Sequence, residues 1–340
     1  MFSRFKSFAA AAALVALGGA AASAQGYSIE GAGSASLTGI VPQTLAQYAS
    51  DEGIDLQVVL GQTLTRSALR VAAGRLDFAV VPPPAYGAMS RGVGPYAQQA
   101  EQAQELSQNM RALFGFPGGT FHAIVWADSG IESWEDVEGR RIYVGPPAGA
   151  ANAQMRGMVR LATGGYEAGE DYEGMRAPWN AAQQAFQDGQ YDVYIAAAAV
   201  GQQSLNELSL LRPIRILGMP EDVLGSQEYA DFLVDSALTT AEIPAGTYEG
   251  QVNSDETLHT PVTTMMIATN ADMSEDVAYR LTRAYWENID EMKANNALLR
   301  TIDESRPFIG VNAPLHPGSL RYYREAGVEV PERLIPEGAE

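Results

Sequence analysis

Two glycine-rich loops are the parts of this sequence whose residue types best suit binding chemistry. The first is Gly31-Ala-Gly-Ser-Ala-Ser36, and the second is Pro146-Pro-Ala-Gly-Ala-Ala-Asn152. Each loop opens a helical pattern, where backbone N–H groups lack partners within the helix and suit a small anion. We expect a carboxylate to be contacted by Gly33, Ser34, Ala35, Ser36, Pro147, Ala148, Gly149, Ala150 and Asn152. A plain tight turn and a proline-fixed helix start are the alternative interpretations of the two loops.

The first loop is also a partial G-x-G-x-x-G pattern, with Ser36 where the last glycine belongs. Taken alone, this is a weak signal for a dinucleotide. The same glycines admit a tight turn that exposes N–H groups, and the hydroxyls of Ser34 and Ser36 could help to hold a carboxylate. We therefore expect a small anionic ligand and no cofactor.

No catalytic set assembles along the chain. The three histidines, His122, His259 and His316, lie far apart without metal-ligand spacing, so each is expected to satisfy a local hydrogen bond. There is no G-x-S-x-G motif and no G-x-x-x-x-G-K motif. We expect a protein that is not an enzyme and binds no metal. The alternative is an exported enzyme that uses Asp77 or Glu30 as a base.

Several side chains next to strand ends could line the same site. Amides would select a polar end of the ligand and aromatic rings would cover an aliphatic stem, although an aromatic at a strand end is often only core. These residues are Gln62, Thr63, Tyr86, Phe116, Trp179 and Asn180.

Strand-like and helix-like patterns alternate from Tyr27 onward and must position these residues. Strands are expected at 27–30, 55–60 and 76–81, with helices at 37–48 and 64–73. Pro82-Pro-Pro84 ends the third strand. This alternation is typical of β-α-β units and predicts a mainly parallel sheet.

The second half of the chain restates this plan. Strands are expected at 141–145 and 191–199, and helices at 149–162 and 181–187. Residues 111–126 are mostly apolar around a Phe-Pro-Gly-Gly-Thr interruption. A strand-like run at 263–269 precedes helices at 274–292 and 314–323. We expect an α/β fold of two lobes joined by a hinge, with the ligand in the interlobe cleft beyond the carboxyl ends of the strands.

The first 24 residues have the pattern of a cleaved signal peptide. Arg4 and Lys6 precede an apolar run that closes on Ala22-Ser-Ala24. The run is shorter than the roughly 20 residues that a membrane-spanning helix needs, and retention as an N-terminal anchor is the alternative to cleavage. The chain has no cysteine, so neither a disulfide framework nor a lipid attachment site is expected. A freely diffusing periplasmic protein, monomeric and without membrane insertion of its own, fits best.

The charge argues against two classes of partner. The formal net charge is −19, and loss of Arg4 and Lys6 with the leader makes it more negative by two. Nucleic acids and anionic membrane surfaces are therefore poor partners.

A series of short motifs in order makes the chain resemble the TAXI family, the solute-binding subunits of tripartite ATP-independent periplasmic (TRAP) transporters. The motifs are Trp126-Ala-Asp-Ser-Gly-Ile131, Trp134-Glu-Asp-Val-Glu-Gly139, Val144-Gly-Pro-Pro147, Ile243-Pro-Ala-Gly-Thr-Tyr248, Ala284-Tyr-Trp-Glu-Asn288 and Pro314-Leu-His-Pro-Gly318. The resemblance covers nearly the whole chain after the leader.

The resemblance implies a type II periplasmic binding fold, a Venus flytrap of two α/β lobes that delivers a small organic anion to a membrane permease. The permease is expected to be fused and driven by an ion gradient. Relatives are associated with glutamate, glutamine or 2-oxoglutarate-like ligands. This chain has Gly31–Ser36 where the family has T-G-G-T-G-G, Gly61-Gln-Thr63 where it often has S-x-G-S, and Ala148–Ala151 where it has G-S-G-T.

These expectations combine into one hypothesis. Lobe 1 comprises residues 25–125 and 259–340, and lobe 2 comprises 126–258. The protein captures a dicarboxylate, a 2-oxo acid or an acidic amino acid and carries it to the permease. An exported enzyme, or a sensor partner that signals through a histidine kinase, remains the alternative use of the same cleft.

Overall fold

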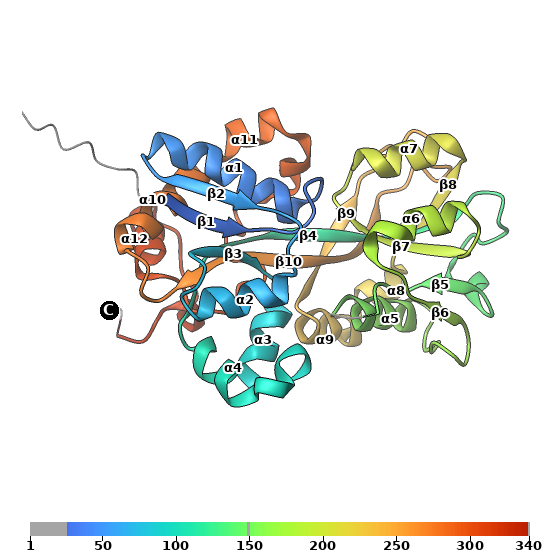
Figure 1. Cartoon of the computed structure of the whole chain (residues 1–340). Coiled ribbons are helices and arrows are strands. Elements are labelled where there is room, and N and C mark those ends of the chain that lie inside the picture. The colour runs from blue at the N-terminus through green and yellow to red at the C-terminus, as the bar shows by residue number, and fades with distance from the viewer. Residues whose placement is uncertain (1–25, 148–149, 339–340) are drawn as a thin grey trace, which may run out of the picture.

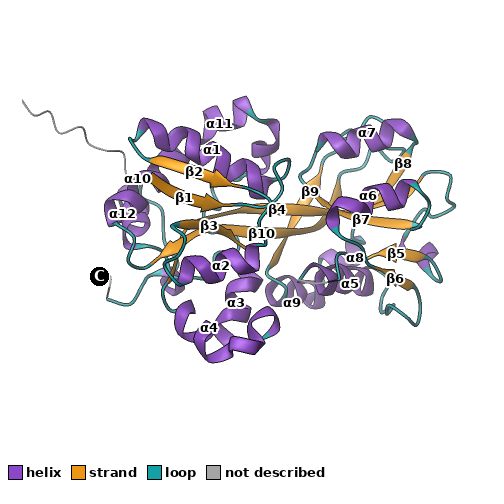
Figure 2. Cartoon of the chain, in the orientation of Figure 1, coloured by secondary structure: helices purple, strands orange, loops and turns teal. Residues whose placement is uncertain are grey.

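The computed structural model describes residues 26–147 and 150–338, in which ten strands form one mixed sheet with helices on both faces (Figures 1 and 2). The main strand order is β2-β1-β3-β10-β4-β7-β5-β6, with β8 paired to β4 and β9 to β10. The strands are β1 (Gly26–Glu30), β2 (Asp55–Val59), β3 (Phe78–Val81), β4 (Met110–Trp126), β5 (Arg141–Tyr143), β6 (Glu173–Met175), β7 (Val193–Ala198), β8 (Ile214–Leu217), β9 (Leu238–Ile243) and β10 (Leu258–Asn270).

Helices connect these strands. They are α1 (Leu37–Asp51), α2 (Leu64–Ala72), α3 (Pro83–Arg91), α4 (Ala100–Ser107), α5 (Ala151–Ala162), α6 (Trp179–Gln187), α7 (Gln203–Leu211), α8 (Glu221–Leu224), α9 (Gln227–Asp235), α10 (Glu275–Glu287), α11 (Ile289–Asn295) and α12 (Pro317–Glu325). Among the residues described, four short 3₁₀ helices lie at Gly94–Gln99, Trp134–Val137, Ala297–Thr301 and Glu332–Leu334. In Figure 1, α1 and α11 lie above the first part of the sheet, and α2, α3 and α4 lie below it.

The apolar core divides between two lobes. The first core draws almost all its residues from the beginning and the end of the chain, including Ile29, Phe78, Phe114 and Tyr285. The second lobe has a core on each face of its part of the sheet, one around Met155 and Tyr229 and one around Phe186 and Leu205. The expected α/β fold with two lobes is therefore confirmed.

Two long strands, β4 and β10, run through both lobes side by side (Figure 1). Phe114 and Phe116 of β4 belong to the first core, whereas Phe121, Ala123 and Val125 pack into the second. β4 therefore changes lobes around Pro117–Gly119, several residues before the boundary after residue 125 that the sequence indicated. The partner strand is irregular at the same level, with a register shift between Val262 and Thr264.

Strand directions set the two lobes facing one another. β10 is antiparallel to both β3 and β4, so β3 runs in the direction of β4, and β1 and β2 run parallel to it. β7 is antiparallel to β4, and β5 and β6 run parallel to β7. Because β4 runs from the first lobe into the second, the carboxyl ends of β1, β2 and β3 point toward the second lobe, and those of β5, β6 and β7 point toward the first.

The strand patterns at 27–30, 55–60, 141–145 and 191–199 are confirmed within a few residues. The expectation of a mainly parallel sheet is wrong in the centre, because β4 and β10 are antiparallel to their neighbours. The interruption at Phe116–Thr120 does not end a strand, because β4 is 17 residues long and continues through it. The prolines that end β3 also begin α3, because proline lacks an N–H group that the first helical turn would leave unpaired.

No helix in the described ranges is long and apolar enough to cross a bilayer. The expected leader, residues 1–24, lies outside the described residues.

Candidate functional site

The loops that follow β1 and β2 are locked together at the inner edge of the first lobe. Gly61 and Gln62 donate their N–H groups to the carbonyls of Ala32 and Gly31, at 2.9 and 3.0 Å. The same loop packs on the start of α1, where a Cβ on Gly31 would lie 2.5 Å from the Thr38 carbonyl oxygen. Only glycine fits there, because real Cβ atoms do not approach so closely. Backbone contacts thus fix the predicted first loop to α1 and to the loop after β2.

Gly39 makes the second close approach in this loop, and sequence reasoning did not single it out. A Cβ on Gly39 would lie 2.3 Å from the carbonyl oxygen of Gly33. A glycine in the first turn of an otherwise regular helix was the available signal, because glycine is costly in a helix interior.

The predicted residues Gly33, Ser34 and Ala35 are exposed at the tip of this loop. Within the described part of the chain, the backbone N–H groups of Ser34, Ala35 and Leu37 donate to no protein acceptor. The Ser36 hydroxyl is already engaged, 2.8 Å from the Gly33 carbonyl oxygen and 2.7 Å from the Thr38 hydroxyl. The free donors of this loop are therefore backbone groups rather than the Ser36 side chain.

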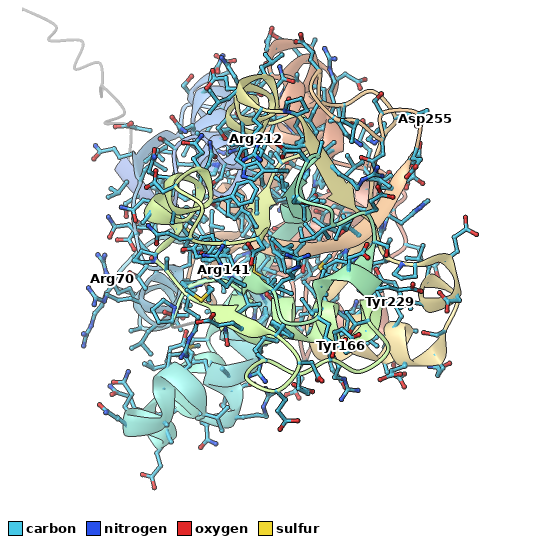
Figure 3. All side chains as sticks on the ribbon, turned by 90° about the vertical axis from the view of Figure 1, so that its right-hand side faces the viewer. Arg70, Arg141, Tyr166, Arg212, Tyr229 and Asp255 are labelled. Carbon is cyan, nitrogen blue, oxygen red and sulfur yellow. The ribbon has the colours of Figure 1, made fainter. Side chains whose placement is uncertain are left out.

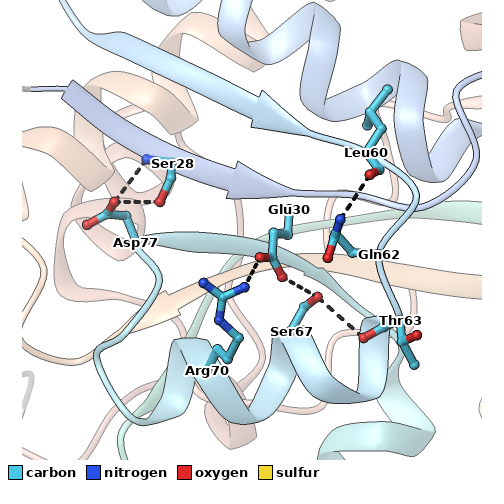
Figure 4. Close-up of polar contacts among 8 residues, drawn as sticks. All are labelled: Ser28, Glu30, Leu60, Gln62, Thr63, Ser67, Arg70 and Asp77. Carbon is cyan, nitrogen blue, oxygen red and sulfur yellow. Dashed lines mark hydrogen bonds and ion pairs between the residues drawn. The ribbon is translucent and has the colours of Figure 1, made fainter.

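Gln62 and Thr63 follow β2 beside this loop (Figure 4). The amide nitrogen of Gln62 donates to the Leu60 carbonyl at 3.0 Å, which leaves its amide oxygen unused by that bond. Thr63 is exposed at the start of α2, and its hydroxyl makes no capping bond. Both residues lie where the sequence predicted them, at the carboxyl end of β2.

Glu30, the last residue of β1, lies under the same loops and pairs with Arg70 of α2 (Figure 4). Its carboxylate also accepts a hydrogen bond from the Ser67 hydroxyl at 2.6 Å. The Glu30 side chain is 5% exposed, whereas the Arg70 side chain is 44% exposed and reaches the edge of the molecule in Figure 3. Arg70 is thus the charged partner of the buried Glu30 carboxylate, which sequence reasoning missed because its helical spacing gave no sign of the pairing.

Asp77, the other carboxylate considered as a base, is held beside the middle of β1. It accepts hydrogen bonds at 2.9 Å from both the backbone N–H and the hydroxyl of Ser28 (Figure 4). The register pairs Glu30 with Ala79, so Asp77 lies beside Ser28, two residues back along the strands, and the two carboxylates have separate partners. The structure does not bring them together.

Tyr86 and Phe116 are both part of the first lobe, in different environments. Tyr86 lies half-buried in the first turns of α3, and burial raises the pKa of its hydroxyl. Phe116 has no exposed surface and packs in the first core. A ligand therefore cannot contact Phe116 in this conformation, because other core side chains cover the ring completely.

The second-lobe loop lies at the carboxyl end of β5. Pro147 and Ala150 are exposed, while Ala148 and Gly149 lie outside the described residues. The side-chain amide of Asn152 donates to the Val144 carbonyl at 2.8 Å, so it holds the loop to the end of the strand. This bond uses one of the two amide hydrogens of Asn152, a residue that was expected to contact the ligand.

Trp179 and Asn180 begin α6, after β6, and both are exposed. The Trp179 ring stands edge-on to Tyr143 of β5, with centroids 6.3 Å apart. The two predicted residues therefore lie at the inner edge of the second lobe, beside the β5 loop.

The histidines are engaged locally. Buried His122 contacts the Thr120 carbonyl and the Tyr248 hydroxyl, and burial lowers its pKa to about 4. His316 accepts the N–H of Gly318 at the start of α12, and burial lowers its pKa as well. His259 lies 3.4 Å from Glu242. Among the described residues, no three His, Cys, Asp or Glu side chains are grouped to hold a metal ion.

Two surface cavities lie away from these loops. One of about 480 Å³ separates α5 from α9 and is lined by Arg156, Gly157 and Phe232 among others. The other, of about 520 Å³, lies where Arg306 and Pro307 meet Leu238 and Thr239. None of the predicted site residues lines either cavity.

Several solved structures resemble this chain. A TRAP periplasmic solute-binding protein from Rhodobacter sphaeroides, described as apo and open, is 14% identical with a TM-score of 0.47, over 81% of this chain and 84% of that one. One from Sulfitobacter with bound β-D-galacturonate is 11% identical with a TM-score of 0.47, over 90% and 88%. The aliphatic sulphonate binding protein SsuA from Escherichia coli is 11% identical with a TM-score of 0.44, over 82% and 78%. At this level of similarity these neighbours say nothing of this chain's ligand.

Sequence comparison at the family level is more direct. The match to the NMT1-like family extends over residues 39–327, from the first turn of α1 to the end of α12, and so takes in both lobes and both crossing strands. The chain belongs to the NMT1-like family.

Proposed function

We propose that this protein is a periplasmic solute-binding protein that captures a small organic anion between its two lobes and delivers it to a membrane permease of the TRAP type. The observation that carries the proposal is the opposition of two sets of strand ends. Loops at the carboxyl ends of β1, β2 and β3 point toward loops at the carboxyl ends of β5, β6 and β7, across two shared strands. Such ends are where open α/β sheets bind ligands.

The chemistry of the loops favours an anion. Among the described residues, the backbone N–H groups of Ser34, Ala35 and Leu37 donate to no protein acceptor at the start of α1. Helix starts favour negative charge, and unpaired backbone donors there suit a carboxylate. We infer a dicarboxylate, a 2-oxo acid or an acidic amino acid as the ligand class.

Binding accounts for these residues better than catalysis. Glu30 is occupied by Arg70 and Ser67, and Asp77 by two donors from Ser28. A general base needs a free lone pair directed at the substrate proton. Neither carboxylate is aimed that way.

Capture follows from lobe closure. Contacts to both sets of loops exist together only when the lobes approach, so the ligand stabilises the closed state through contacts that the open state lacks. We propose lobe 1 as the chain up to Gly119 and from Thr263 onward, and lobe 2 as the chain between them, with the hinge in β4 and β10. The TAXI type of TRAP receptor, with its fused permease, is the specific assignment that the sequence motifs favour.

A ligand screen tests the proposal. The chain from Gln25 onward is screened by thermal shift against succinate, 2-oxoglutarate, glutamate, ethanesulfonate and glucose, and hits are measured by calorimetry. A ligand at 100 times its Kd adds about 2.7 kcal/mol of stability. We expect a carboxylate to bind and to be recovered unchanged. Binding of glucose without any anion, or turnover of a bound anion, would overturn the proposal.

Matched variants locate the site. Ala35 and Ala150 are exposed on the two opposing loops, and Ala326 is exposed at the end of α12, on the far side of the first lobe (Figure 1). Ala35→Trp and Ala150→Trp should each abolish binding of the anion that stabilises the unmodified protein, with little change in Tm. Ala326→Trp should bind normally. Equal affinity in all three would remove these loops from the site.

A further inference from the structure

A buried hydrogen-bonded chain ends at the turn that follows β7. His122 Nδ1 lies 2.9 Å from the Thr120 carbonyl oxygen, and its Nε2 lies 2.8 Å from the Tyr248 hydroxyl. The N–H of Gly201 donates to the same hydroxyl at 3.1 Å. A carbonyl only accepts, so Nδ1 carries the imidazole proton and Nε2 accepts from Tyr248. The chain of donors therefore has one direction, from Gly201 through Tyr248 and His122 to Thr120.

The segment Ile243–Tyr248 is built to place this hydroxyl. Gly246 has a φ of +71° and donates its N–H to the Ser254 carbonyl at 2.7 Å. The Thr247 hydroxyl donates a hydrogen bond to the Pro244 carbonyl oxygen at 2.6 Å. Tyr248 is then 1% exposed, with its ring edge-on to His122 and the centroids 5.7 Å apart. The motif that the sequence singled out thus serves to aim one side chain.

The Ala199–Gln202 turn, which holds the Gly201 end of the hydrogen-bonded chain, is tightly defined. Gln202 donates its N–H to the Ala199 carbonyl at 3.1 Å, and Gly201 has the φ of +76° that the third position of such a turn requires. The Gln202 amide oxygen accepts from the Ala199 N–H at 3.3 Å. Ala199 itself packs into the core of the first lobe, although β7 belongs to the second.

The position of the turn gives it a role. β7 lies between β4 and β5 in the sheet, so its carboxyl end stands between the crossing strands and the loop at 144–152. Gly201 is exposed, and Val200 and Gln202 are half-buried. The turn therefore touches one lobe while belonging to the other, next to the proposed site.

We propose that the Ala199–Gln202 turn forms a further wall of the ligand site and that Tyr248 and His122 are its positioning residues. The wall rests on the proposed solute-binding function, whereas the hold of Tyr248 on the turn does not. Loss of the Tyr248 hydroxyl would free the Gly201 N–H and leave His122 Nε2 without a donor. The turn would then lose its fixed position against the first lobe.

Tyr248→Phe tests this, with Tyr229→Phe as the matched control. Tyr229 is also buried in the second lobe, 2% exposed, and its hydroxyl lies 3.1 Å from that of Thr240, in the core around Met155. We expect amide hydrogen exchange at Gly201 to become at least about tenfold faster in Tyr248→Phe and to stay unchanged in Tyr229→Phe. Unchanged exchange in Tyr248→Phe would overturn the proposal.

Affinity separates the wall from a purely structural role. For any of succinate, 2-oxoglutarate, glutamate or ethanesulfonate that binds the unmodified protein, Kd should rise about tenfold in Tyr248→Phe and remain unchanged in Tyr229→Phe. Faster exchange with an unchanged Kd would show that the turn is not part of the site, and would overturn the wall. Should Tyr248→Phe fail to fold, exchange in the unmodified protein decides: the Gly201 amide should exchange more slowly than an exposed amide without a hydrogen bond, and equally fast exchange would overturn the proposal.

A third readout needs no ligand. The chain has no cysteine, so spin labels at Gln47→Cys on α1 and Ala230→Cys on α9, both exposed, report the distance between lobes. The distance distribution should broaden in Tyr248→Phe and keep its width in Tyr229→Phe. If none of the four anions binds the unmodified protein, the proposed anion function fails. The broadening then decides whether the turn governs lobe contact, and no broadening overturns the inference.

Discussion

The Thr263 hydroxyl of β10 bonds both the N–H and the carbonyl oxygen of Gly119 in β4. The Gly119 N–H donates to the Thr263 hydroxyl oxygen at 2.7 Å, and the hydroxyl lies 3.2 Å from the Gly119 carbonyl oxygen as a donor. This contact lies at the level where both strands pass from one lobe to the other, and where the backbone register shifts. A single side chain thus replaces the regular ladder of backbone bonds in the middle of the proposed hinge.

Thr263→Val should loosen the hinge. It removes both bonds and leaves the Gly119 N–H without its acceptor, so the free energy of unfolding should fall by about 1–3 kcal/mol. Urea denaturation measures this loss, and the labels at positions 47 and 230 should show a broader distance distribution. Thr269→Val is the control, because Thr269 is buried on the same strand and donates to the Asp77 carbonyl at 2.7 Å. A broader distribution in the control as well would contradict a specific role for Thr263.

Gly115→Ala should destabilise the first lobe by overpacking. A Cβ on Gly115 would lie 2.2 Å from the backbone oxygen of Ile309, which cannot rotate away. The expected loss is about 1–3 kcal/mol, measured by thermal or urea unfolding. Gly225→Ala should be neutral or slightly stabilising, because nothing lies within 4 Å of its Cβ position and its φ is −85°. Equal effects of the two substitutions would refute the packing argument.

Arg70→Ala should cost more than its surface position suggests. It leaves the Glu30 carboxylate buried with the Ser67 hydroxyl as a donor, and we expect a loss of about 1–3 kcal/mol. Adding Glu30→Gln should restore part of that loss, because the unpaired charge is then gone. Arg160→Ala, which breaks an exposed pair with Glu228, should change stability by less than about 1 kcal/mol. No rescue in the double variant would contradict the charge argument.

Stability should fall on the acid side because of His122. Burial lowers the pKa of His122 from 6.5 to about 4, so between these pH values the unfolded chain binds a proton that the folded chain does not. The free energy of unfolding is therefore unaffected by this group above about pH 6.5 and declines as the pH falls toward 4, by up to about 3 kcal/mol.

His122→Gln isolates that contribution. The variant should be less stable at pH 7, because it loses the imidazole bonds, and the difference from the unmodified protein should narrow between pH 6.5 and 4. His316 has a lowered pKa too, but it is present in both proteins and cancels in the comparison. A difference that stays constant over this pH range would show that His122 does not titrate as stated.

The outer strands and helices of both lobes could be predicted because each follows from local pattern. Alternating apolar runs, capping residues and glycine stops located β1, β2, α2 and β5 within a few residues. The centre of the sheet could not be predicted in this way. β4 continues through Pro117-Gly-Gly119 because the long-range contacts with β10 and β7 override the local breakers.

The candidate site was predictable by position and less so by chemistry. The glycine loops lie at the strand ends as expected, but the Ser36 hydroxyl and the Asn152 amide there bond to the protein itself. Phe116 lies in the core because the pairing of β4 with β10 decides which way its side chain faces. The sequence around Phe116 does not reveal that pairing. The Glu30–Arg70 pair and the 199–202 turn depend on partners far away in sequence, which local pattern does not reveal.

The place of β10 in the sheet governs when this protein can fold. β10 lies between β3 and β4, and Met266 pairs with Val81, so the first lobe has a gap in its sheet until most of the polypeptide has been synthesised. Until then β3 and β4 lack their shared partner, and pairings so distant along the chain form slowly. We propose that this chain is exported. This connectivity alone would keep the first lobe of the nascent polypeptide unfolded, and so able to pass through a translocation channel, until synthesis is nearly complete.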